Sequence, residues 1–498
     1  MRLGQIRIGS AAGVVAGALM FFAGAACLFI PKIGIEADEV LFVPPVYHYA
    51  AVGSVKIGRH QLPTMLMSYV GADKTWLLAA IIKAIPPSTW SLRLPAVLIG
   101  ILSLWLLFAT VRRLANDRVA AALVCLLATD PMFLLSTTMD WGPVALTHLF
   151  FIAALYFAAR EKPMIFLASI SLGLAFWDKG TAVWTLPGLF LCMLVFFPGV
   201  VRAHASLVNV AKALAGFAIG AWPFLRYNML THWATFRDNA RFSTDGMPDK
   251  LRVMGVTLNG QGMFDWLVLG GTPLWYTLAP VGIAAAVILL FNRRVAPIRP
   301  LAHFALFTGL FTWISMLSAA SGGTSIHHTI LVWPWLPLFA LCVLGYALNG
   351  KQFGIAVAAM AISNIVMIGL YAERARDYGP GPHWSDASFE LPALIQSVPA
   401  DRKIATIDWG IDLPAIFLTG GSRRIEDRTF LDTSSPDFVA EATGTQFLTR
   451  VAEEEVKTGN NAKFDAAIGK LGLVRRVDRV ISDRHGRPFY VSFHCERP

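Results

Sequence analysis

The sequence AAGVVAGALMFFAGAACLFI, residues 11–30, is the first of many long apolar runs, and these runs decide the fold. Twenty helical residues rise about 30 Å, which matches the hydrocarbon thickness of a bilayer. Arg2 and Arg7 precede the run, so a cleaved signal peptide is an alternative interpretation. The run is longer than the apolar part of a signal peptide, and many more follow. We therefore predict an uncleaved first span.

The composition of the chain excludes an ordinary soluble protein. Hydrophobic residues make up 55% of the 498 residues and charged residues only 15%, which does not suit one soluble core. Together with the first run, the remaining apolar runs predict a polytopic α-helical membrane protein with about eleven transmembrane helices. These remaining runs cover residues 94–110, 119–138, 143–158, 163–177, 181–197, 208–224, 266–291, 301–320, 329–348 and 353–371.

The net charge of +10 is explained by membrane topology rather than by a nucleic-acid partner. If the N-terminus is cytoplasmic, the basic segments between runs all face the cytoplasm, as the positive-inside rule requires. The opposite loops and the C-terminal part then lie outside the plasma (inner) membrane. Four of the five cysteines fall inside apolar runs, so no disulfide framework is predicted. The basic segments are VRRLANDR (111–118), REK (160–162), VRAH (201–204), FNRR (291–294) and NGK (349–351).

The composition changes near residue 371, which divides the chain into two predicted domains. Residues 1–371 form the membrane domain and include a first outer loop, residues 31–93. The Gly- and Pro-rich stretch YGPGPHWSD, residues 378–386, then marks a break. Residues 372–498 are predicted to form an extracytoplasmic α/β domain of ordinary size. Its predicted elements include the strands KIATI (403–407) and FYVSF (489–493) and a helix over 437–456.

Two adjacent acids follow the first span in GIEADEVLFVPPVYH, residues 34–48. On a helix, Asp38 and Glu39 would point about 100° apart, so both could not address one atom. We expect one acid to reach a site and a neighbour to hold the other. The alternative for this pair is a solvated loop with a helix N-cap.

A third acid, Asp140, lies in the short turn within TTMDWGPVALTHL, residues 137–149. Asp before Pro at a helix start is explained by capping alone. A carboxylate in so tight a turn is also rigidly placed, as a general base must be. Asp38 and Asp140 are therefore the candidate catalytic residues, and we expect them to converge in one crevice at the outer water boundary.

Several cations are predicted at the same membrane face. An amphipathic helix predicted over residues 65–85 carries Lys74, and Arg93 follows at the end of the loop. Lys74 could neutralise a phosphate, although a single interfacial lysine commonly snorkels to lipid headgroups. Lys179 could also contact a phosphate or could pair with its neighbour Asp178. Lys74, Arg93 and Lys179 are the cationic candidates for substrate binding, with Glu39 beside them.

Two adjacent histidines, His327 and His328, are predicted at the outer mouth of the tenth span. Neighbouring histidines rarely share one metal ion, and no companion ligand follows three or four residues later. One of the two remains a candidate ligand or hydrogen-bond donor.

A carboxylate base with phosphate-binding cations is suited to moving a sugar off a polyprenyl phosphate. The cations would steady the leaving phosphate, and the carboxylate would take the proton of the attacking hydroxyl. A transporter or lipid flippase is the alternative, but it should carry charged or broken segments at mid-membrane, and these spans are nearly free of charge there. A third interpretation is an inactive sensor whose outer domain binds a glycan.

Several motifs resemble those of the lipid-carrier-dependent GT-C glycosyltransferases, above all the family 39 protein mannosyltransferase-like enzymes and the aminoarabinose transferases. The resemblance covers about residues 30–345. It is carried by ADEVLF (37–42), STWSLRLPAVLIGILSLWLLFATVRRL (88–114), the Asp140 turn, LGLAFWDKGTAVWTLPGLF (172–190) and WPWLPLFAL (333–341).

The resemblance implies roles for individual residues. Asp38 matches the catalytic carboxylate of that family, and Asp140 matches its second outer acid. ADKTW, residues 72–76, resembles the family's acid-Lys-Pro motif, in which the lysine contacts the carrier phosphate, but Thr75 replaces the proline. Asp73 with His327 or His328 could imitate a divalent metal site found in some relatives. The resemblance thus implies a polyprenyl-phosphate-linked sugar as donor, an unassigned acceptor and membrane lipids as partners.

Overall fold

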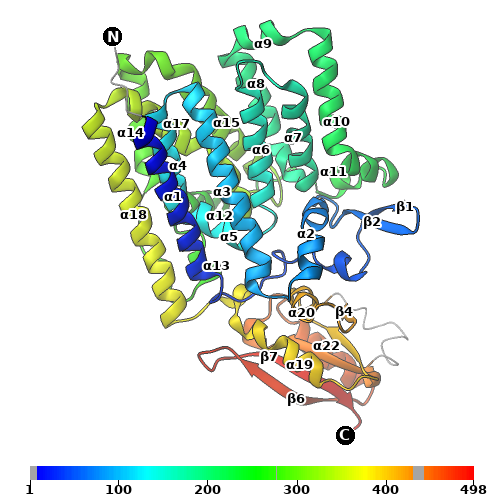
Figure 1. Cartoon of the computed structure of the whole chain (residues 1–498). Helices are drawn as coiled ribbons and strands as arrows, with labels where there is room; N and C mark the ends of the chain where they lie inside the picture. Colours follow the sequence, from blue (N-terminus) through cyan, green and yellow to red (C-terminus); the bar gives the residue numbers. More distant parts are fainter. Residues whose placement is uncertain (1–7, 240, 276, 430–441) are drawn as a thin grey trace.

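The first apolar run forms helix α1 (Ile8–Phe29), which lies in a bundle of apolar helices (Figure 1). This computed structural model describes residues 8–239, 241–275, 277–429 and 442–498. The described end of α1 nearest the N-terminus and the C-terminal domain lie at opposite ends of the bundle (Figure 1). The bundle also contains α3 (Thr89–Leu114), α4 (Asp117–Thr129), α5 (Pro131–Met139), α6 (Ala145–Ala158), α7 (Ile165–Asp178), α8 (Leu186–Phe196), α9 (Pro198–His204), α10 (Leu207–Leu230), α14 (Leu278–Phe291), α15 (Arg299–Ser318), α17 (Trp335–Ala347) and α18 (Gly350–Asp377).

Membrane-spanning helices are the main feature of the described residues. Six helical segments are long and apolar enough to cross a bilayer, and two bent helix pairs raise this number to as many as eight. Three shorter apolar helices, α6, α7 and α14, accompany them. The prediction of a polytopic helical membrane protein is therefore confirmed. The six segments are Ala11–Phe29, Thr89–Leu114, Leu207–Leu230, Arg293–Ser318, Ile326–Ala347 and Gly350–Asp377.

Two of the predicted spans are not continuous helices. The predicted span 119–138 is bent by 62° between α4 and α5, where Asp130 caps α5 and Pro131 cannot donate a backbone hydrogen bond. The predicted span 266–291 is wrong in its first part, because α14 begins only at Leu278. The short helix α13 (Phe264–Leu267) ends at the extended residue Val268, and Gly270 and Gly271 then adopt positive φ.

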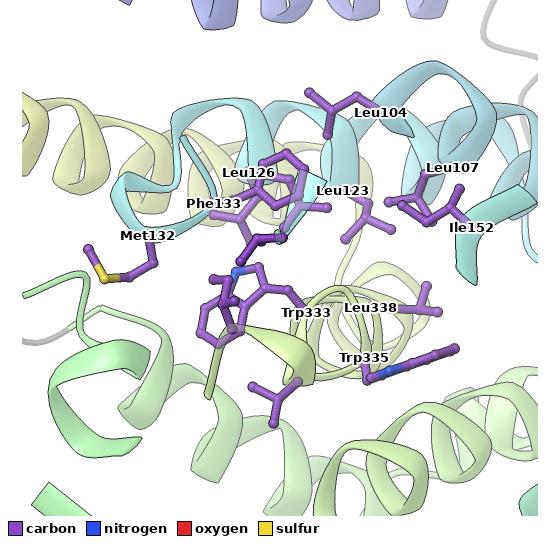
Figure 2. Packing of buried hydrophobic residues seen from close by; sticks show 14 of the residues in the cluster. Leu104, Leu107, Leu123, Leu126, Met132, Phe133, Ile152, Trp333, Trp335 and Leu338 are labelled. Atoms are coloured by element: carbon purple, nitrogen blue, oxygen red, sulfur yellow. The ribbon is translucent and has the colours of Figure 1, made fainter. Parts of the chain in front are cut away.

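The bundle has a packed interior and an apolar exterior. Figure 2 shows Phe133 of α5 and Trp333, which precedes α17, within the core between the helices. Both side chains are at most 2% exposed. Ile283, Leu290 and Ile362 on α14 and α18 are instead more than half exposed, as side chains facing lipid would be.

The loop between α1 and α3 has its own secondary structure. It contains η1 (Pro44–Tyr47), the antiparallel hairpin of β1 (Gly53–Ile57) and β2 (His60–Met65), and α2 (Asp73–Ala84). The predicted amphipathic helix over 65–85 is therefore correct only from Asp73 onward. α3 begins at Thr89 with a capping box on Ser88, so Arg93 belongs to the first turns of this helix rather than to the loop.

Shorter elements connect the helices of the bundle. They are η2 (Gly180–Trp184), α11 (Ala234–Asn239), α12 (Met247–Leu258), η3 (Arg293–Ile298), α16 (Ile326–Thr329) and η4 (Ile330–Val332).

The C-terminal domain is a five-stranded mixed sheet with helices on both faces. The strand order is β4-β3-β5-β7-β6; β3 is parallel to β4 and β5, and the remaining pairs are antiparallel. α19 and α20 pack on one face and α22 on the other. The elements are η5 (Pro382–Trp384), η6 (Asp386–Glu390), α19 (Leu391–Ser397), β3 (Lys403–Thr406), α20 (Asp412–Leu418), β4 (Ile425–Asp427), β5 (Thr445–Arg450), η7 (Ala452–Glu454), α22 (Asn460–Lys470), β6 (Val474–Ser482) and β7 (Pro488–Glu496).

The two predicted strands of this domain are confirmed as β3 and part of β7. The predicted helix over 437–456 is wrong for Thr445–Arg450, which form the central strand β5, although residues 442–444 are helical. Residues 437–441 lie outside the described residues. All six residues of β5 are buried, and such a strand lacks the alternating pattern that identifies a half-buried one.

The C-terminal domain packs directly on the loop that follows α1. Phe417 of α20 shares an apolar cluster with Val40, Phe42 and Val46. The Tyr49 hydroxyl accepts a hydrogen bond from the Ile425 backbone N–H of β4 at 2.9 Å. We call this contact between residues 31–49 and the C-terminal domain the seam.

Candidate functional site

The candidate site begins in the turn after α1, where three acids lie within four residues. The Glu36 carboxylate accepts hydrogen bonds from the backbone N–H groups of Asp38 (2.6 Å) and Glu39 (3.3 Å). Glu36 therefore closes the turn by capping it from within. Asp38 is half-buried, whereas Glu36 and Glu39 are 3% and 1% exposed. Only Asp38 of the three can readily meet a substrate.

Glu39 is held by Arg93 at the start of α3. Arg93 Nε and Nη2 donate to the two carboxylate oxygens of Glu39 at 2.6 and 2.9 Å. The remaining guanidinium donors bind the backbone carbonyls of Ile30, Ile33 and Gly34. All five donors of Arg93 are thus used within the protein.

Arg93 and Glu39, which the sequence analysis names as substrate-binding candidates, are thus engaged with each other in this structure. Both side chains are about 1% exposed and satisfy each other. Their pair pins the turn to α3 and leaves the neighbouring acid, Asp38, at the site. This division of roles between the adjacent acids is the one the sequence predicted.

Asp140 ends α5 and performs two structural tasks. Its Oδ1 accepts from the N–H groups of Val144 and Ala145 at 2.9 and 2.8 Å, which caps α6. Its Oδ2 lies 2.6 Å from Lys74 Nζ, and both side chains are nearly buried. Asp140 adopts left-handed backbone angles, φ 43° and ψ 45°, which few residues other than glycine take.

Lys74 links the two acidic turns. Its ammonium lies 3.4 Å from the Glu39 carbonyl, one residue after Asp38, in addition to its ion pair with Asp140. The ammonium also sits 4.2 Å from the centroid of the Phe42 ring. The turns at 38 and 140, about a hundred residues apart in sequence, thus meet at Lys74.

Lys179 lies on the other side of the same cluster. Its ammonium donates to the Gly142 carbonyl, which uses one of its three donors. Its positive charge attracts the carboxylates of Asp38, Asp140 and Asp178. The Asp178 carboxylate also accepts a hydrogen bond from Thr147, so Lys179 and Asp178 do not form an exclusive ion pair.

An aromatic group gathers around Trp141, which lies beside Asp38. The Trp141 indole contacts the rings of His327 (4.9 Å), Trp384 (5.0 Å) and Trp266 (5.3 Å). The predicted residue His327 therefore lies in the site, with its Nδ1 2.9 Å from Ser325 Oγ. His328 lies next to it but packs its ring against Trp184 and is 9% exposed.

The structure pairs the predicted metal ligand Asp73 with another acid. Its carboxyl lies against that of Asp178, and neither Asp73 oxygen accepts a hydrogen bond of good distance and angle among the described residues. Burial raises the pKa of Asp73 to about 7. Across the described ranges, no three side chains of His, Cys, Asp or Glu gather closely enough to hold a metal ion. The metal requirement stays a prediction.

The pKa values separate the two candidate catalytic acids. Burial raises the pKa of Asp38, and the Lys179 charge and the Trp141 indole only partly offset this. Burial also raises the pKa of Asp140, but the Lys74 charge and the two capping N–H groups outweigh it and hold the pKa below its ordinary value. A carboxylate with a raised pKa is the stronger base, so Asp38 suits proton abstraction better than Asp140.

Three residues of the site escaped the sequence analysis. Glu36 lies within the quoted stretch and could have been recognised as a turn-capping acid two residues before Asp38. Trp141 follows Asp140 directly, so its position was available. Trp384 lies in the C-terminal domain and gave no local signal.

A cleft of about 530 Å³ opens elsewhere, between the end of α1 and β6. Its lining includes Lys32 and Arg479, but neither Asp38 nor Lys179. We therefore place the candidate site at Asp38, where the ionisable groups converge.

Comparison with known proteins shows what this chain is similar to. Residues 74–225 match the family model described as dolichyl-phosphate-mannose-protein mannosyltransferase. A search of curated proteins finds no match. The matched residues include Lys74, Arg93, Asp140 and Lys179, but not the turn that carries Asp38.

Solved structures show the same fold over nearly the whole chain. ArnT from Cupriavidus metallidurans bound to undecaprenyl phosphate is 13% identical with a TM-score of 0.59, covering 97% of this chain and 98% of ArnT. The apo oligosaccharyltransferase of Archaeoglobus fulgidus is 11% identical with a TM-score of 0.54, covering 90% of this chain and 70% of that enzyme. These solved structures, each under 25% identical, show that the chain shares their fold, and the family model adds a similarity to the protein mannosyltransferases over residues 74–225.

Proposed function

We propose that this protein transfers a sugar from a polyprenyl-phosphate donor to an acceptor hydroxyl at the outer face of the plasma membrane. The observation that carries the proposal is Asp38, a half-buried acid with a raised pKa that lies beside buried cations at the end of a lipid-facing helical bundle. The likeness to an ArnT structure with bound undecaprenyl phosphate supports a lipid-linked donor.

The chemistry follows from the arrangement of the charged groups. The acceptor hydroxyl attacks the anomeric carbon, its proton passes to Asp38, and the bond from that carbon to the phosphate oxygen breaks. The electron pair leaves with the phosphate, whose charge Lys179 and Lys74 stabilise. A single displacement of this kind inverts the anomeric centre, since no second carboxylate acts as a nucleophile.

Lys179 is the better-placed phosphate contact of the two lysines. Lys74 is already engaged by Asp140, the Glu39 carbonyl and the Phe42 ring. Lys179 has a single carbonyl partner and lies next to Asp38. Asp140 then serves the reaction by fixing Lys74 and the α5–α6 turn, and not by taking a proton.

The orientation of the chain in the membrane is part of the proposal. The C-terminal domain lies at one end of the bundle, and the described start of α1 lies at the other (Figure 1). The segment that carries Asp38 packs on this domain, since Gly34 donates to the Trp384 carbonyl. The basic segments predicted to be cytoplasmic include Arg112 and Arg113 at the far end of α3. The positive-inside rule then places the N-terminus in the cytoplasm and the C-terminal domain outside.

Replacing Asp38 tests the proposed function. We expect Asp38→Asn to lower transfer from radiolabelled polyprenyl-phosphate sugars by about 10²- to 10⁴-fold, because the general base is lost. The purified variant should elute and melt like the unmodified protein. Asp245→Asn removes an exposed acid and is the matched control. Near-normal transfer by Asp38→Asn would remove Asp38 from the mechanism.

The donor and the acceptor require separate measurements. A panel of polyprenyl-phosphate sugars offered to the purified protein identifies the donor, and NMR of the product reports whether the anomeric centre inverts. Mass spectrometry of envelope glycans in a deletion strain identifies the acceptor class. If no donor in the panel is consumed by the unmodified protein, the proposal fails.

A further inference from the structure

The C-terminal domain holds the backbone of the segment that carries Asp38. The Gly34 N–H donates to the Trp384 carbonyl at 2.8 Å, and the Ile35 N–H donates to Ser388 Oγ at 3.1 Å. The approach at Gly34 is so close that an added Cβ would lie 1.9 Å from the Ser385 carbonyl oxygen. Only glycine fits there, so the seam fixes the start of the turn.

The same part of the C-terminal domain reaches the site through a side chain. The Trp384 ring is fully buried and meets the Trp141 ring edge to face, with centroids 5.0 Å apart and planes at 83°. The Trp384 indole N–H has no hydrogen-bond partner, so packing alone holds this ring.

Trp141 in turn faces the candidate base. Its indole N–H has no hydrogen bond of good distance and angle, yet it lies close enough to Asp38 to influence the carboxyl group. Trp141 is 4% exposed and is enclosed by Trp384, Trp266 and the His327 ring. A shift of Trp384 would therefore be transmitted to the Trp141 indole beside Asp38.

We propose that Trp384 is a positioning residue for the transfer reaction, and that it acts on Asp38 through Trp141. The C-terminal domain then completes the active site from outside the bundle: its backbone anchors residues 34 and 35 on one side of the base, and its indole sets Trp141 on the other. This inference rests on the proposed function. It gives the C-terminal domain a direct part in the orientation of the base.

A double-mutant cycle in the full-length protein tests this coupling. We expect Trp384→Ala to lower kcat by about 10- to 100-fold, because small misplacements of a reacting group cost rates of this order. The KM for the polyprenyl-phosphate donor should change less than twofold. Trp141→Phe should give a similar loss, and adding Trp384→Ala to it should cost little more, because both act along one path. Independent, multiplying losses would overturn the proposal, as would an unchanged kcat.

Two further variants guard against a trivial loss of folding. Trp384→Phe keeps a ring at the contact and should retain most of kcat, even if Trp384→Ala proves unstable. Phe389→Ala removes a partly exposed ring five residues away and should leave kcat unchanged. If Trp384→Phe loses as much as a folded Trp384→Ala, or if Phe389→Ala matches their loss, the ring contact is not the cause.

A readout without turnover separates this inference from the proposed function. In protein labelled with 5-fluorotryptophan, the ¹⁹F resonance missing from Trp141→Phe belongs to Trp141. We expect it to shift with pH as Asp38 titrates, to stop doing so in Asp38→Asn, and to lose the shift in Trp384→Ala. A full shift in Trp384→Ala would overturn the inference. Absence of sugar transfer by the unmodified protein would instead overturn the proposed function. The pH dependence of the Trp141 resonance would still test the role of Trp384.

Discussion

At the scale of single residues, acidic side chains take different roles because their partners differ. Glu39 forms an ion pair with Arg93. Asp140 forms an ion pair with Lys74 and caps the start of α6, so both acids stabilise turns. Asp38 has a cation nearby but no buried ion pair of its own, and it is half-buried. Of these three acids, the one that we propose as the base is the one that no ion pair holds among the described residues.

The pH dependence of transfer tests this assignment. Burial raises the pKa of Asp38, and the positive charge of Lys179 lowers it in part. The base works only when deprotonated, so activity should fall as the pH drops through the Asp38 pKa. Lys179→Gln removes the opposing charge, raises this pKa further and should move the acid limb of kcat/KM to higher pH.

Lys74→Gln is the matched control for that shift. Lys74 acts on Asp140 and Glu39, so its loss should weaken transfer without moving the acid limb. A profile of kcat/KM against pH for the three proteins checks this. An unmoved limb in Lys179→Gln, or an equal shift in both variants, would contradict the assignment of Asp38 as the base.

How far the sequence predicts the site follows from the distances along the chain between partners. Asp38, Lys74, Asp140 and Lys179 were found because charge beside long apolar runs is unusual. The role of Arg93 was missed because its partner Glu39 lies 54 positions away, and no local pattern encodes such a pairing. The contact between Trp384 and Trp141 joins two domains, and no local sequence pattern predicts it.

At the scale of elements, apolar length predicts where spans lie, but not where they break. The runs at 94–110 and 353–371 became the long helices α3 and α18, and Pro95, which lies near the start of α3, does not break that helix. The run at 119–138 is equally apolar, yet Asp130 and Pro131 divide it into two helices. Composition averaged over a window hides such a break, and only capping chemistry reveals it.

Close helix packing depends on small residues in α7 and α10. A Cβ added at Gly220 of α10 would lie 2.3 Å from the Ile170 carbonyl oxygen of α7. We expect Gly220→Ala to push these helices apart and to cost about 1–3 kcal/mol, as overpacking does. Thermal unfolding of the purified protein in detergent should show a lower Tm.

Gly369→Ala in α18 is the control for that change. No atom lies within 4 Å of a Cβ added there, so the alanine meets no obstacle. Alanine also favours helix over glycine by about 0.5–1 kcal/mol, so the Tm should stay or rise slightly. Equal Tm values for the two variants would show that the contact between α7 and α10 tolerates separation.

At the scale of the whole molecule, the C-terminal domain and the loop after α1 share a single apolar cluster. Phe417 of α20 is fully buried among Val40, Phe42 and Val46, and Tyr47 packs against both parts. The turn that carries Asp38 is therefore held between α3 on one side and the C-terminal domain on the other. Its rigidity should depend on both.

Hydrogen exchange in the full-length protein tests this dependence. Replacing a buried phenylalanine by alanine lowers the free energy of unfolding by about 3–5 kcal/mol. We therefore choose leucine, which keeps most of the side-chain volume and the fold. We expect Phe417→Leu to speed amide exchange in residues 40–47 as well as in α20, because the seam opens as one unit. Phe464→Leu alters the cluster on the opposite face of the sheet and should speed exchange in α22 and β7 while leaving residues 40–47 unchanged. Faster exchange confined to α20 in Phe417→Leu would mean that the loop is held by the bundle alone.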